Sequence, residues 1–353
     1  MGIKNLNQFL RKNCPNIYVE KHLSNYAFKK IAIDISLYMF KYKTIFGDNW
    51  VDAFINLISC LRRNEIHCVF VYDGKAPPDK EKEQEKRIKE RQKIREKAQE
   101  TNEAISQYHL DNIVTDFLKE LYTTRVQKNK EVLRLLRPVQ FDIKIIEEEL
   151  QKLKSQSVSI TSEDFELTKK LFDLMAVPYV IADMEAETMC SHLCKSGLVY
   201  GVLSEDTDVL AYNTPCFLNK INTSDDTCIE IRIENILEEL DISYELFRDL
   251  CIMCGTDYNS NIFRIGPINA FKLLKNNGSI EQIESSGIDT SVLKYKRVRE
   301  LFTIDNNLDI FIPFCKYPDT EKLKRFLIEN KSKVNLGKVI EAFSPKELVF
   351  EDK

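Results

Sequence analysis

The chain has 353 residues, of which 43% are hydrophobic and 30% charged, and its formal net charge is −4. A chain of this length can bury a full core in one elaborated domain or in two. It has no run of eighteen or more apolar residues, and its first segment, MGIKNLNQFLRKNC, lacks the apolar core of a secretory signal. We therefore expect a soluble intracellular protein with no membrane partner.

The ten cysteines, in a chain without a secretory signal, indicate thiols in a reducing compartment rather than a disulfide framework. Cys251 and Cys254 form a C-x-x-C motif within the apolar segment LCIMCG, with no second pair at zinc-ribbon spacing. We expect both to be buried core residues, with metal or redox use as the weaker alternative.

Short apolar runs rich in Val, Ile and Tyr alternate along the chain with longer amphipathic stretches such as WVDAFINLISCLRRN. The runs are KKIAIDIS, HCVFVYDG, AVPYVIAD and LVYGVLSED. This alternation predicts parallel βαβ units. In open α/β sheets, ligands and catalytic groups gather at the carboxyl ends of the strands.

From Asp79 to about Lys154 the sequence is highly charged and favours helix, with breaks predicted near Asp111-Asn112 and at Pro138. Its apolar positions recur at helical spacing and predict packing, so we expect a lid or arch rather than a free solvated coil. These positions are Ile113, Val114, Phe117, Leu118 and Leu121. From Ile236 the chain is predicted to be helical again, and a turn at 265–267 begins another helix.

Carboxylates recur where apolar runs stop. Asp34 lies inside IAIDIS, where no turn role explains it, whereas Asp73 before Gly74 would by itself be an ordinary turn residue. The acids are Asp34, Asp73, Glu185, Glu187, Asp206, Asp208 and Asp257. A buried acid needs a partner, and acids held together repel unless cations neutralise them. Two Mg²⁺ ions would do so and would favour hydrolysis of a phosphodiester.

The spacing of these acids limits how they can act together. Glu185 and Glu187 would point about 200° apart within a regular helix, so they can share a metal only at a helix start or in a turn. Asp183 is the predicted N-cap of that helix. Asp206 and Asp208 follow a strand that ends near Leu203, on one side of it, and for one of them capping of the next helix is the alternative.

Basic residues supply a counterpart to the acids. Lys80 and Arg87 lie seven residues apart, on one face of a predicted helix, where they would grip the scissile phosphate; solvated charges are the alternative. Two further clusters could face phosphates or be solvated helix faces, and both readings stay open. They are Lys119, Arg125, Lys128, Lys130, Arg134 and Arg137, and Lys294, Lys296, Arg297 and Arg299. With the seven acids set aside as metal ligands, the formal charge becomes positive.

Taken with their flanking residues, these segments match a known pattern: the MGI-x-x-L start, IDIS, VYDGKAPP, MEAE, SEDTDVL, CGTDY and NIFRIGPINAFKLL. Over nearly its whole length the chain resembles the flap endonuclease/XPG family of structure-specific 5′ nucleases. The resemblance implies an α/β fold, with a PIN-like, mostly parallel central sheet flanked by helices, an inserted helical arch and a C-terminal helix-two-turn-helix region. The expected regions are 1–100 (N-terminal nuclease region), 79–160 (gateway and arch), 161–250 (internal nuclease region) and 251–345 (duplex binding).

The resemblance also assigns roles. Asp34, Asp73, Glu185 and Glu187 would hold a first metal, and Asp206, Asp208 and Asp257 a second, so the implied cofactor is two Mg²⁺ per subunit, with Mn²⁺ able to substitute. Lys80 and Arg87 match the family's catalytic basic pair. The implied DNA contacts are Gly2, Tyr38 or Phe40 as a base-stacking aromatic, Glu185, Gly255, Asp257, Ile265 and Gly266.

The chain departs from the family pattern at identifiable places. Arg264 stands where a second glycine is usual, and Ile268 and Asn269 stand where basic residues are usual. The sequence therefore does not decide whether a monovalent ion binds at this turn. The short Asp34–Asp73 spacing implies a trimmed wedge, and the long Arg87–Glu185 spacing implies an enlarged arch. The segment AFSPKELVFEDK lacks the usual sliding-clamp box, so clamp binding is not expected.

These observations predict a Mg²⁺-dependent structure-specific 5′ nuclease that cleaves DNA in replication or repair. We expect a monomer that acts on branched or nicked DNA with a 5′ end in the nucleus, or in the host nucleus if the source is viral, with the cytoplasm as the alternative. Two other classes remain: a haloacid-dehalogenase-like phosphatase, because DTDVL resembles its D-x-D motif, and a non-catalytic nuclease-like scaffold. The first leaves Asp34, Asp73 and the Glu pair unexplained, and the second leaves all seven acids unexplained.

Overall fold

The structure is a computed structural model, and it describes residues 2–128, 141–303 and 310–344. The chain forms two compact units. The sheet unit comprises Met1–Tyr42, Phe46–Glu81 and Thr161–Lys353, and the helical unit comprises Lys43–Ile45 and Lys82–Ile160.

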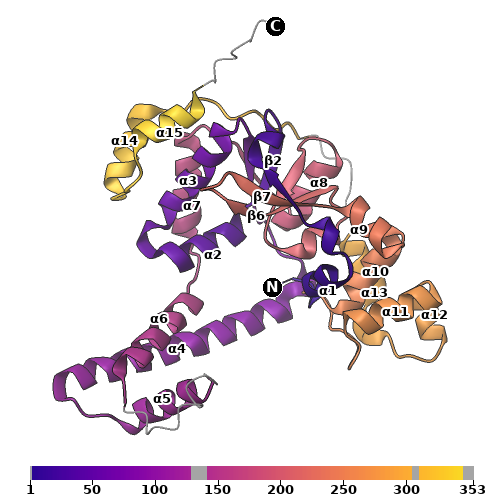
Figure 1. Ribbon diagram of the computed structural model, residues 1–353, viewed down its shortest axis with the longest axis horizontal. Coiled ribbons are helices and arrows are strands. Elements are labelled where there is room, and N and C mark those ends of the chain that lie inside the picture. Colours follow the sequence, from indigo (N-terminus) through magenta and orange to yellow (C-terminus); the bar gives the residue numbers. More distant parts are fainter. Residues whose placement is uncertain (1, 129–140, 304–309, 345–353) are drawn as a thin grey trace, which may run out of the picture. The chain divides into compact units, whose positions relative to one another are not determined.

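The sheet unit contains a seven-stranded sheet in the order β1-β7-β6-β5-β2-β3-β4 (Figure 1). The strands are β1 (Val19–His22), β2 (Lys30–Asp34), β3 (His67–Tyr72), β4 (Tyr179–Ile181), β5 (Gly201–Leu203), β6 (Cys216–Asn222) and β7 (Thr227–Arg232). The five strands from β6 to β4 run parallel, whereas β7 pairs antiparallel with β6, and β1 antiparallel with β7. The predicted mostly parallel sheet is therefore confirmed, and the four predicted apolar runs form β2 to β5.

Helices cover both faces of this sheet, which explains why its central strands are almost entirely hydrophobic. Along β3, Val69 and Val71 join the core cluster that includes helix α8 (Ala186–Lys195). Phe70, between them in sequence, stacks on Phe172 of α7 (Ser162–Leu174) at 4.1 Å between ring centroids and lies 5.8 Å from Phe54 of α3 (Trp50–Arg63). Alternate side chains of one strand thus serve two cores.

The remaining helices of the sheet unit surround this core. They are α1 (Leu6–Asn13), α2 (Ile35–Phe46), α9 (Ile233–Leu240), α10 (Tyr244–Cys254), α11 (Pro267–Asn277), α12 (Ile280–Ser285), α13 (Tyr295–Leu301), α14 (Thr320–Glu329) and α15 (Leu336–Phe343). The helix α10 contacts α11 and α13, whereas α15 contacts α3. Cys251 and Cys254 of α10 are free and buried, as predicted. The predicted helix after the turn at 265–267 is α11.

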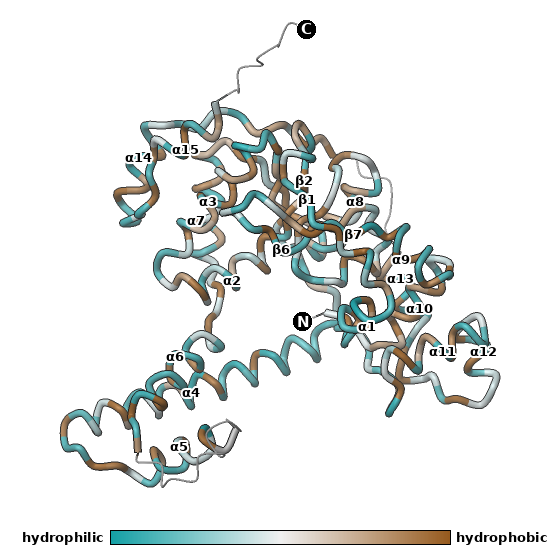
Figure 2. Tube along the Cα trace, viewed as in Figure 1, coloured by the Kyte–Doolittle hydropathy of each residue, from teal (hydrophilic) through white to brown (hydrophobic). Residues whose placement is uncertain are grey.

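The helical unit contains α4 (Glu81–Asp111), α5 (Asp116–Lys128) and α6 (Ile143–Gln156). The first half of α4 is mostly hydrophilic, with isolated hydrophobic positions (Figure 2). Ala98 and Ile105 of its second half are buried with Leu118 and Ile146 in a separate small core. The predicted end of α4 at Asp111-Asn112 is correct, whereas Pro138 lies outside the described residues.

One packing prediction in the helical unit is wrong. Val114, Phe117 and Leu121 pack against the small core as expected, but Ile113 is 61% exposed. The physical reason is the backbone before it: Asn112 has φ 57, a left-handed conformation that ends α4 and turns the chain out of the helix.

Most described cations of the two basic clusters have partners within the protein. In the helical unit Lys119 pairs with Asp116 and Arg125 with Glu149. In the sheet unit Arg297 pairs with Asp79 and Glu300, and Arg299 with Asp249 and Glu281. Lys130, Arg134 and Arg137 lie outside the described residues. These four residues are therefore engaged in ion pairs with the protein's own carboxylates, which does not favour phosphate binding by them.

Candidate active site

The sheet brings most of the predicted acids to one edge. Asp34 is the last residue of β2, Asp73 follows β3, Glu185 follows β4 and Asp206 follows β5. Because β4, β3, β2 and β5 are adjacent and parallel, their carboxyl ends meet at the same edge of the sheet. The topology therefore gathers acids that are far apart in sequence.

The buried acids interact electrostatically. Burial and then the charge of Asp73 raise the pKa of Asp34 to about 8. Burial, followed by the charges of Asp206 and Asp208, raises the pKa of Glu187 well above its ordinary value. Burial and Asp206 likewise raise the pKa of Asp208. Each shift shows that negative charge is costly here without a counter-ion.

Lys80 supplies one positive charge to this cluster. Its Nζ lies 2.5 Å from Glu185 Oε1 and 3.4 Å from Asp257 Oδ2, and its side chain is only 11% exposed. Burial lowers the pKa of Lys80, but the charges of Glu187 and Glu185 outweigh that effect and raise it overall. Lys80 therefore remains charged and draws Asp257, which follows α10, into the same site.

Arg87, the other member of the predicted basic pair, belongs to the helical unit. Within that unit its Nε lies 3.3 Å from Glu83 Oε1, one helical turn away. Its role toward the acids stays a prediction.

Asp73 connects β3 to the start of α8. Its Oδ1 accepts the backbone N–H of Ala186 at 2.9 Å, and its Oδ2 accepts the hydroxyl of Ser36 at 2.6 Å. The turn after it is closely packed, since a Cβ on Gly74 would lie 2.0 Å from the carbonyl oxygen of Ala182. A carboxylate at a helix N-terminus is favoured by the helix dipole.

The Glu pair lies at a helix start, as its spacing required, because α8 begins at Ala186. The predicted N-cap was wrong. Glu185, with φ −101 and ψ 141, is the N-cap of α8 rather than Asp183. The physical reason is that Gly74 and Lys75 donate backbone hydrogen bonds to the carbonyls of Met184 and Asp183, which holds that segment against the end of β3.

Asp206 and Asp208 meet the N-terminus of the chain. Asp206 caps the short helix Thr207–Leu210 and accepts the backbone N–H of Asp208 at 3.2 Å, so the capping alternative holds for one member of the pair. Asp208 accepts the backbone N–H of Ile3 at 2.5 Å. Gly2 has φ 88, and a Cβ there would lie 2.1 Å from Asp206 Oδ1 and 2.6 Å from Asp208 Oδ1. Only glycine fits this position.

The donor set of the site consists of carboxylate oxygens, the ligands that Mg²⁺ and Mn²⁺ prefer. Across residues 2–128, 141–303 and 310–344, no group of three or more His, Cys, Asp or Glu side chains is already spaced to hold a metal ion. Several carboxylate oxygens instead accept hydrogen bonds from Lys80, backbone amides and the hydroxyl of Tyr258. The buried acids with raised pKa values nevertheless fit a divalent cation by their chemistry and charge.

The predicted DNA contacts differ in accessibility. Tyr38 is fully buried, whereas Phe40 two residues later is partly exposed. Gly255 has φ 89 and accepts the backbone N–H of Lys4 at 3.1 Å. Gly266 is the N-cap of α11, beside the half-buried Ile265, and a Cβ on it would meet no atom within 4 Å. Phe40, rather than Tyr38, has the exposure that base stacking requires.

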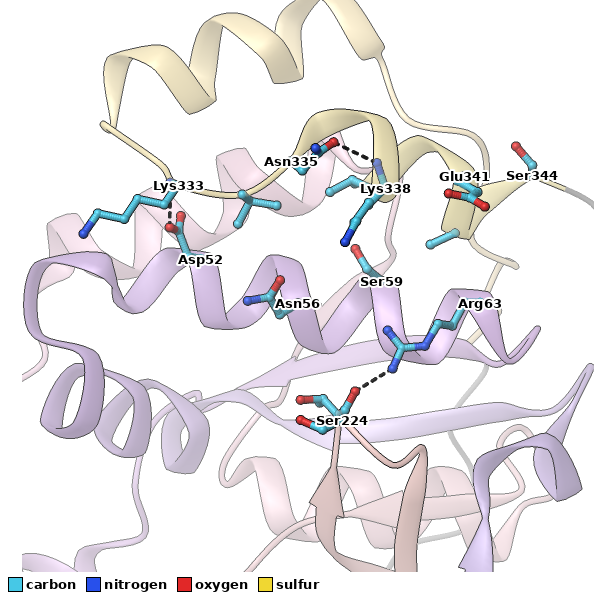
Figure 3. Close-up of a pocket in the computed structure, with 14 residues that line it drawn as sticks. Asp52, Asn56, Ser59, Arg63, Ser224, Lys333, Asn335, Lys338, Glu341 and Ser344 are labelled. Carbon is cyan, nitrogen blue, oxygen red and sulfur yellow. Dashed lines mark hydrogen bonds between the residues drawn. The ribbon is translucent and has the colours of Figure 1, made fainter.

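A separate groove of about 920 Å³ lies between α3 and the segment that contains α15 (Figure 3). None of the seven acids lines it. Its Arg63 is held by Asp226 at 3.0 Å, and its Asp52 accepts the backbone N–H of Lys333 at 2.9 Å. The carboxylate cluster, rather than this groove, therefore carries the chemistry.

Sequence reasoning missed three hydroxyl groups that organise the site. Tyr258 donates to Glu185 and contacts the hydroxyl of Tyr212 at 3.1 Å, and Ser36 donates to Asp73. The available signals were their positions, Tyr258 directly after Asp257 and Ser36 two residues after Asp34. Their partners are distant in sequence, so the pairings themselves needed the fold.

Comparison with known proteins gives matches along the chain. The family models described as the XPG N-terminal domain and the XPG I-region match residues 1–94 and 176–257. A protein of Invertebrate iridescent virus 6 named "Probable RAD2-like endonuclease 369L" is 32% identical over 335 residues, which span 86% of this chain and 79% of that protein. Flap endonuclease 1 of Debaryomyces hansenii is 30% identical over 359 residues, spanning 94% of this chain and 84% of that protein.

The fold also matches solved structures. The catalytic core of Rad2 in complex with DNA substrate superposes with a TM-score of 0.63 and 16% identity, covering 97% of this chain and 98% of that one. At this identity the likeness concerns the fold alone, and it agrees with the mostly parallel α/β architecture described above.

Proposed function

The chain belongs to the flap endonuclease/XPG family of structure-specific nucleases, and from this premise we propose that it is a divalent-metal-dependent 5′ nuclease that hydrolyses DNA phosphodiester bonds. The observation that carries the proposal is the meeting of four parallel strand ends, each followed by an acid, with Lys80 already inserted among the acids. This arrangement concentrates oxygen ligands and one cation at a single point. Such a site is suited to phosphoryl transfer.

Two Mg²⁺ ions, or Mn²⁺ in their place, are the proposed cofactors. Asp34, Asp73, Glu185 and Glu187 would hold one ion, and Asp206, Asp208 and Asp257 the other. Bound there, the ions would lower the pKa of a water molecule and stabilise the charge that develops on the phosphoryl oxygens.

The protein's own groups hold this machinery in place. Lys80 contacts both Glu185 and Asp257 and, as a buried cation, is positioned to neutralise charge on the scissile phosphate. Ser36 and the backbone N–H of Ala186 orient the two oxygens of Asp73. Gly2 keeps the entry to Asp206 and Asp208 free of a side chain.

The proposed substrate is branched or nicked DNA with a 5′ end. Phe40 is the proposed stacking residue for the base beside the cleaved bond. Gly255, Ile265 and Gly266 are the proposed contacts to the duplex backbone, which position the DNA without reading its sequence. The helical unit, with Arg87, is the proposed arch that selects the 5′ strand.

The competing classes are not favoured. A phosphatase built on DTDVL would use Asp206 and Asp208 alone. Acids from other segments lie close to them, because the charges of Asp206 and Asp208 raise the pKa of Glu187 and the charge of Asp257 raises the pKa of Asp208. A non-catalytic scaffold would gain nothing from burying these acids together, since each buried negative charge is costly.

We propose that the protein acts in DNA replication or repair as a monomer, in the nucleus or host nucleus, without a sliding clamp. In the described part of the chain no helix is long and apolar enough to cross a membrane. Residues 345–353, which form most of the segment AFSPKELVFEDK considered for clamp binding, lie outside the described residues.

The test is a panel of labelled substrates, namely 5′ flap, nick, gap, bubble and four-way junction, incubated with the full chain in Mg²⁺ and sized on a denaturing gel. Cleavage near the junction of a 5′ branch, absent in chelator, is expected. Cleavage of none of these substrates, or an equal rate on unbranched duplex, would overturn the proposal.

A further inference from the structure

The turn that joins α10 to α11 carries an aromatic side chain that is largely exposed. Phe263 is 82% exposed, and Ile268 in the first turn of α11 is 46% exposed. The guanidinium carbon of Arg264 lies 5.0 Å from the centroid of the Phe263 ring. An aromatic ring and a cation are therefore presented together at the surface.

The turn is ordered by its own hydrogen bonds. The side-chain amide of Asn261 donates to the carbonyls of Ile262 and Ile265 at 3.1 and 3.2 Å, and the N–H of Ile265 donates to Ile262 at 3.0 Å. Arg264 has φ 63, in the left-handed region where residues with side chains are uncommon. The backbone thus holds Phe263 at the surface in a defined position, so its exposure does not depend on a loose loop.

The surroundings of the turn fit a polyanion. Between Asp257 and Glu281 the chain has no acidic residue and three basic ones, Arg264, Lys272 and Lys275, all exposed. Lys275 is bound to Asp241, which leaves the positive charge concentrated toward Arg264 and Lys272. An apolar group within a positive surface suits duplex DNA, which offers apolar surface between its stacked base pairs and phosphates along its backbone.

The turn also lies within reach of DNA at the acids. Phe263 follows Asp257 by six residues, and a chain segment of that length spans at most about 20 Å. Because each base pair of B-DNA adds about 3.4 Å, that distance corresponds to about six base pairs at most. A duplex that extends from the carboxylate cluster toward this turn would therefore reach Phe263 within its first helical turn.

We propose that Phe263 is a minor-groove wedge that grips the duplex beside the cleaved end, with Arg264 contacting the adjacent phosphate. The inference rests on the proposed nuclease function and names a substrate-positioning residue for it. Proteins that bind the minor groove insert apolar side chains between neighbouring base pairs and flank them with basic residues. In this chain Phe263 and Arg264 would together hold the duplex at the turn, and Arg264 stands where the family usually has a glycine.

The experiment measures binding and base stacking with the full chain in chelator, where cleavage does not interfere. Flap DNA carries 2-aminopurine at successive positions within eight base pairs of the junction, and affinity is read from fluorescence anisotropy. Phe263→Ala is expected to bind flap duplex about tenfold more weakly and to leave the affinity for single-stranded DNA unchanged. It is also expected to abolish the change in 2-aminopurine fluorescence that the wild type causes on binding. Phe263→Trp is expected to restore both.

Phe311→Ala is the matched control, because Phe311 is 83% exposed and has Lys30 5.7 Å from its ring. It should bind as the wild type does. Unchanged affinity of Phe263→Ala would overturn the inference, as would an equal loss with Phe311→Ala or a loss confined to the single strand. Cleavage by the wild type is scored separately in Mg²⁺, so a chain that binds duplex through Phe263 but cuts nothing refutes the nuclease proposal alone.

Discussion

Lys80 is the residue whose removal tests the site most directly. Its ammonium contacts Glu185 and Asp257, and the pKa of Lys80 is raised because the neighbouring Glu187 and Glu185 outweigh its burial. In Lys80→Ala the site loses the cation that contacts Glu185 and Asp257. In saturating Mg²⁺ we expect the rate of cleavage to fall while DNA affinity stays nearly constant.

The magnitude follows from the position of the charge. A fixed donor aimed at charge that develops in a transition state is worth about 2.7–4 kcal/mol, which corresponds to a 10²–10³-fold slower chemical step. Removing one partner of a buried ion pair costs about 3–5 kcal/mol, so the metal-free variant should also be less stable. Added Mg²⁺ should remove most of that second difference, because the ion would neutralise the same carboxylates.

The assay is single-turnover cleavage of a 5′ flap at saturating enzyme, with affinity and thermal unfolding measured in parallel with and without Mg²⁺. Lys82→Ala is the matched control, since Lys82 is exposed and two residues further along the same segment. An affinity loss without a slower chemical step would place Lys80 in DNA binding only. A variant with unchanged rate and unchanged metal-free stability would refute the reasoning altogether.

Three further changes test other parts of the site and fold. Gly2→Ala should slow cleavage at least tenfold because its Cβ would meet Asp206, whereas Gly47→Ala, with φ 54 and no atom within 4 Å of its Cβ, should only lower thermal stability slightly. Asp206→Asn should abolish gel-detected cleavage and leave flap affinity within about threefold, since metal-bound catalysis and duplex grip use different residues. Glu281→Gln tests the Arg299 ion pair by urea unfolding: the hydrogen bond from Arg299 lowers the pKa of Glu281 from 4.5 to about 2, so the pair stabilises the fold above about pH 4.5 and loses that effect as the pH falls toward 2. The difference at pH 7 should stay below about 1 kcal/mol, because the Glu281 side chain is 46% exposed, and a difference that persists at pH 2 would contradict this account.

The sequence predicted β2 to β5 and the acids after them for one physical reason. Strands buried on both faces are continuous apolar runs, and an acid such as Asp34 at the end of such a run is conspicuous. Strands β1, β6 and β7 were not predicted, because their sequences, VEKH, CFLNKIN and TCIEIR, mix polar with apolar residues and lack a continuous apolar run. Tyr38 shows what a sequence pattern does not distinguish. An aromatic residue near the site can either stack on DNA or pack in the core, and only the burial of Tyr38 in the structure shows that it packs in the core.

The partners of the acids were harder to predict than the acids. The sequence predicted Lys80 and Arg87 as the basic pair, but the charge density of the run DKEKEQEKRIKERQKIREK left solvated side chains as the alternative. The fold distinguishes the two for Lys80, which is buried, whereas Lys82 is exposed. Tyr258 was missed because its hydrogen bond to Glu185 joins segments that the sequence does not relate.

The distribution of charge also links metal binding to DNA binding. Without divalent ions, the buried acids would repel a phosphate brought to the strand ends, whereas the acid-free stretch between Asp257 and Glu281 attracts the duplex. Neutralising the acids should therefore strengthen binding of a branched end, and by thermodynamic reciprocity DNA should strengthen metal binding by the same factor. Flap affinity of Lys80→Ala, measured against Ca²⁺ concentration, should rise more steeply than that of the wild type, because the variant has lost a competing cation. Equal slopes would mean that Lys80 and the divalent ions do not share the same carboxylates.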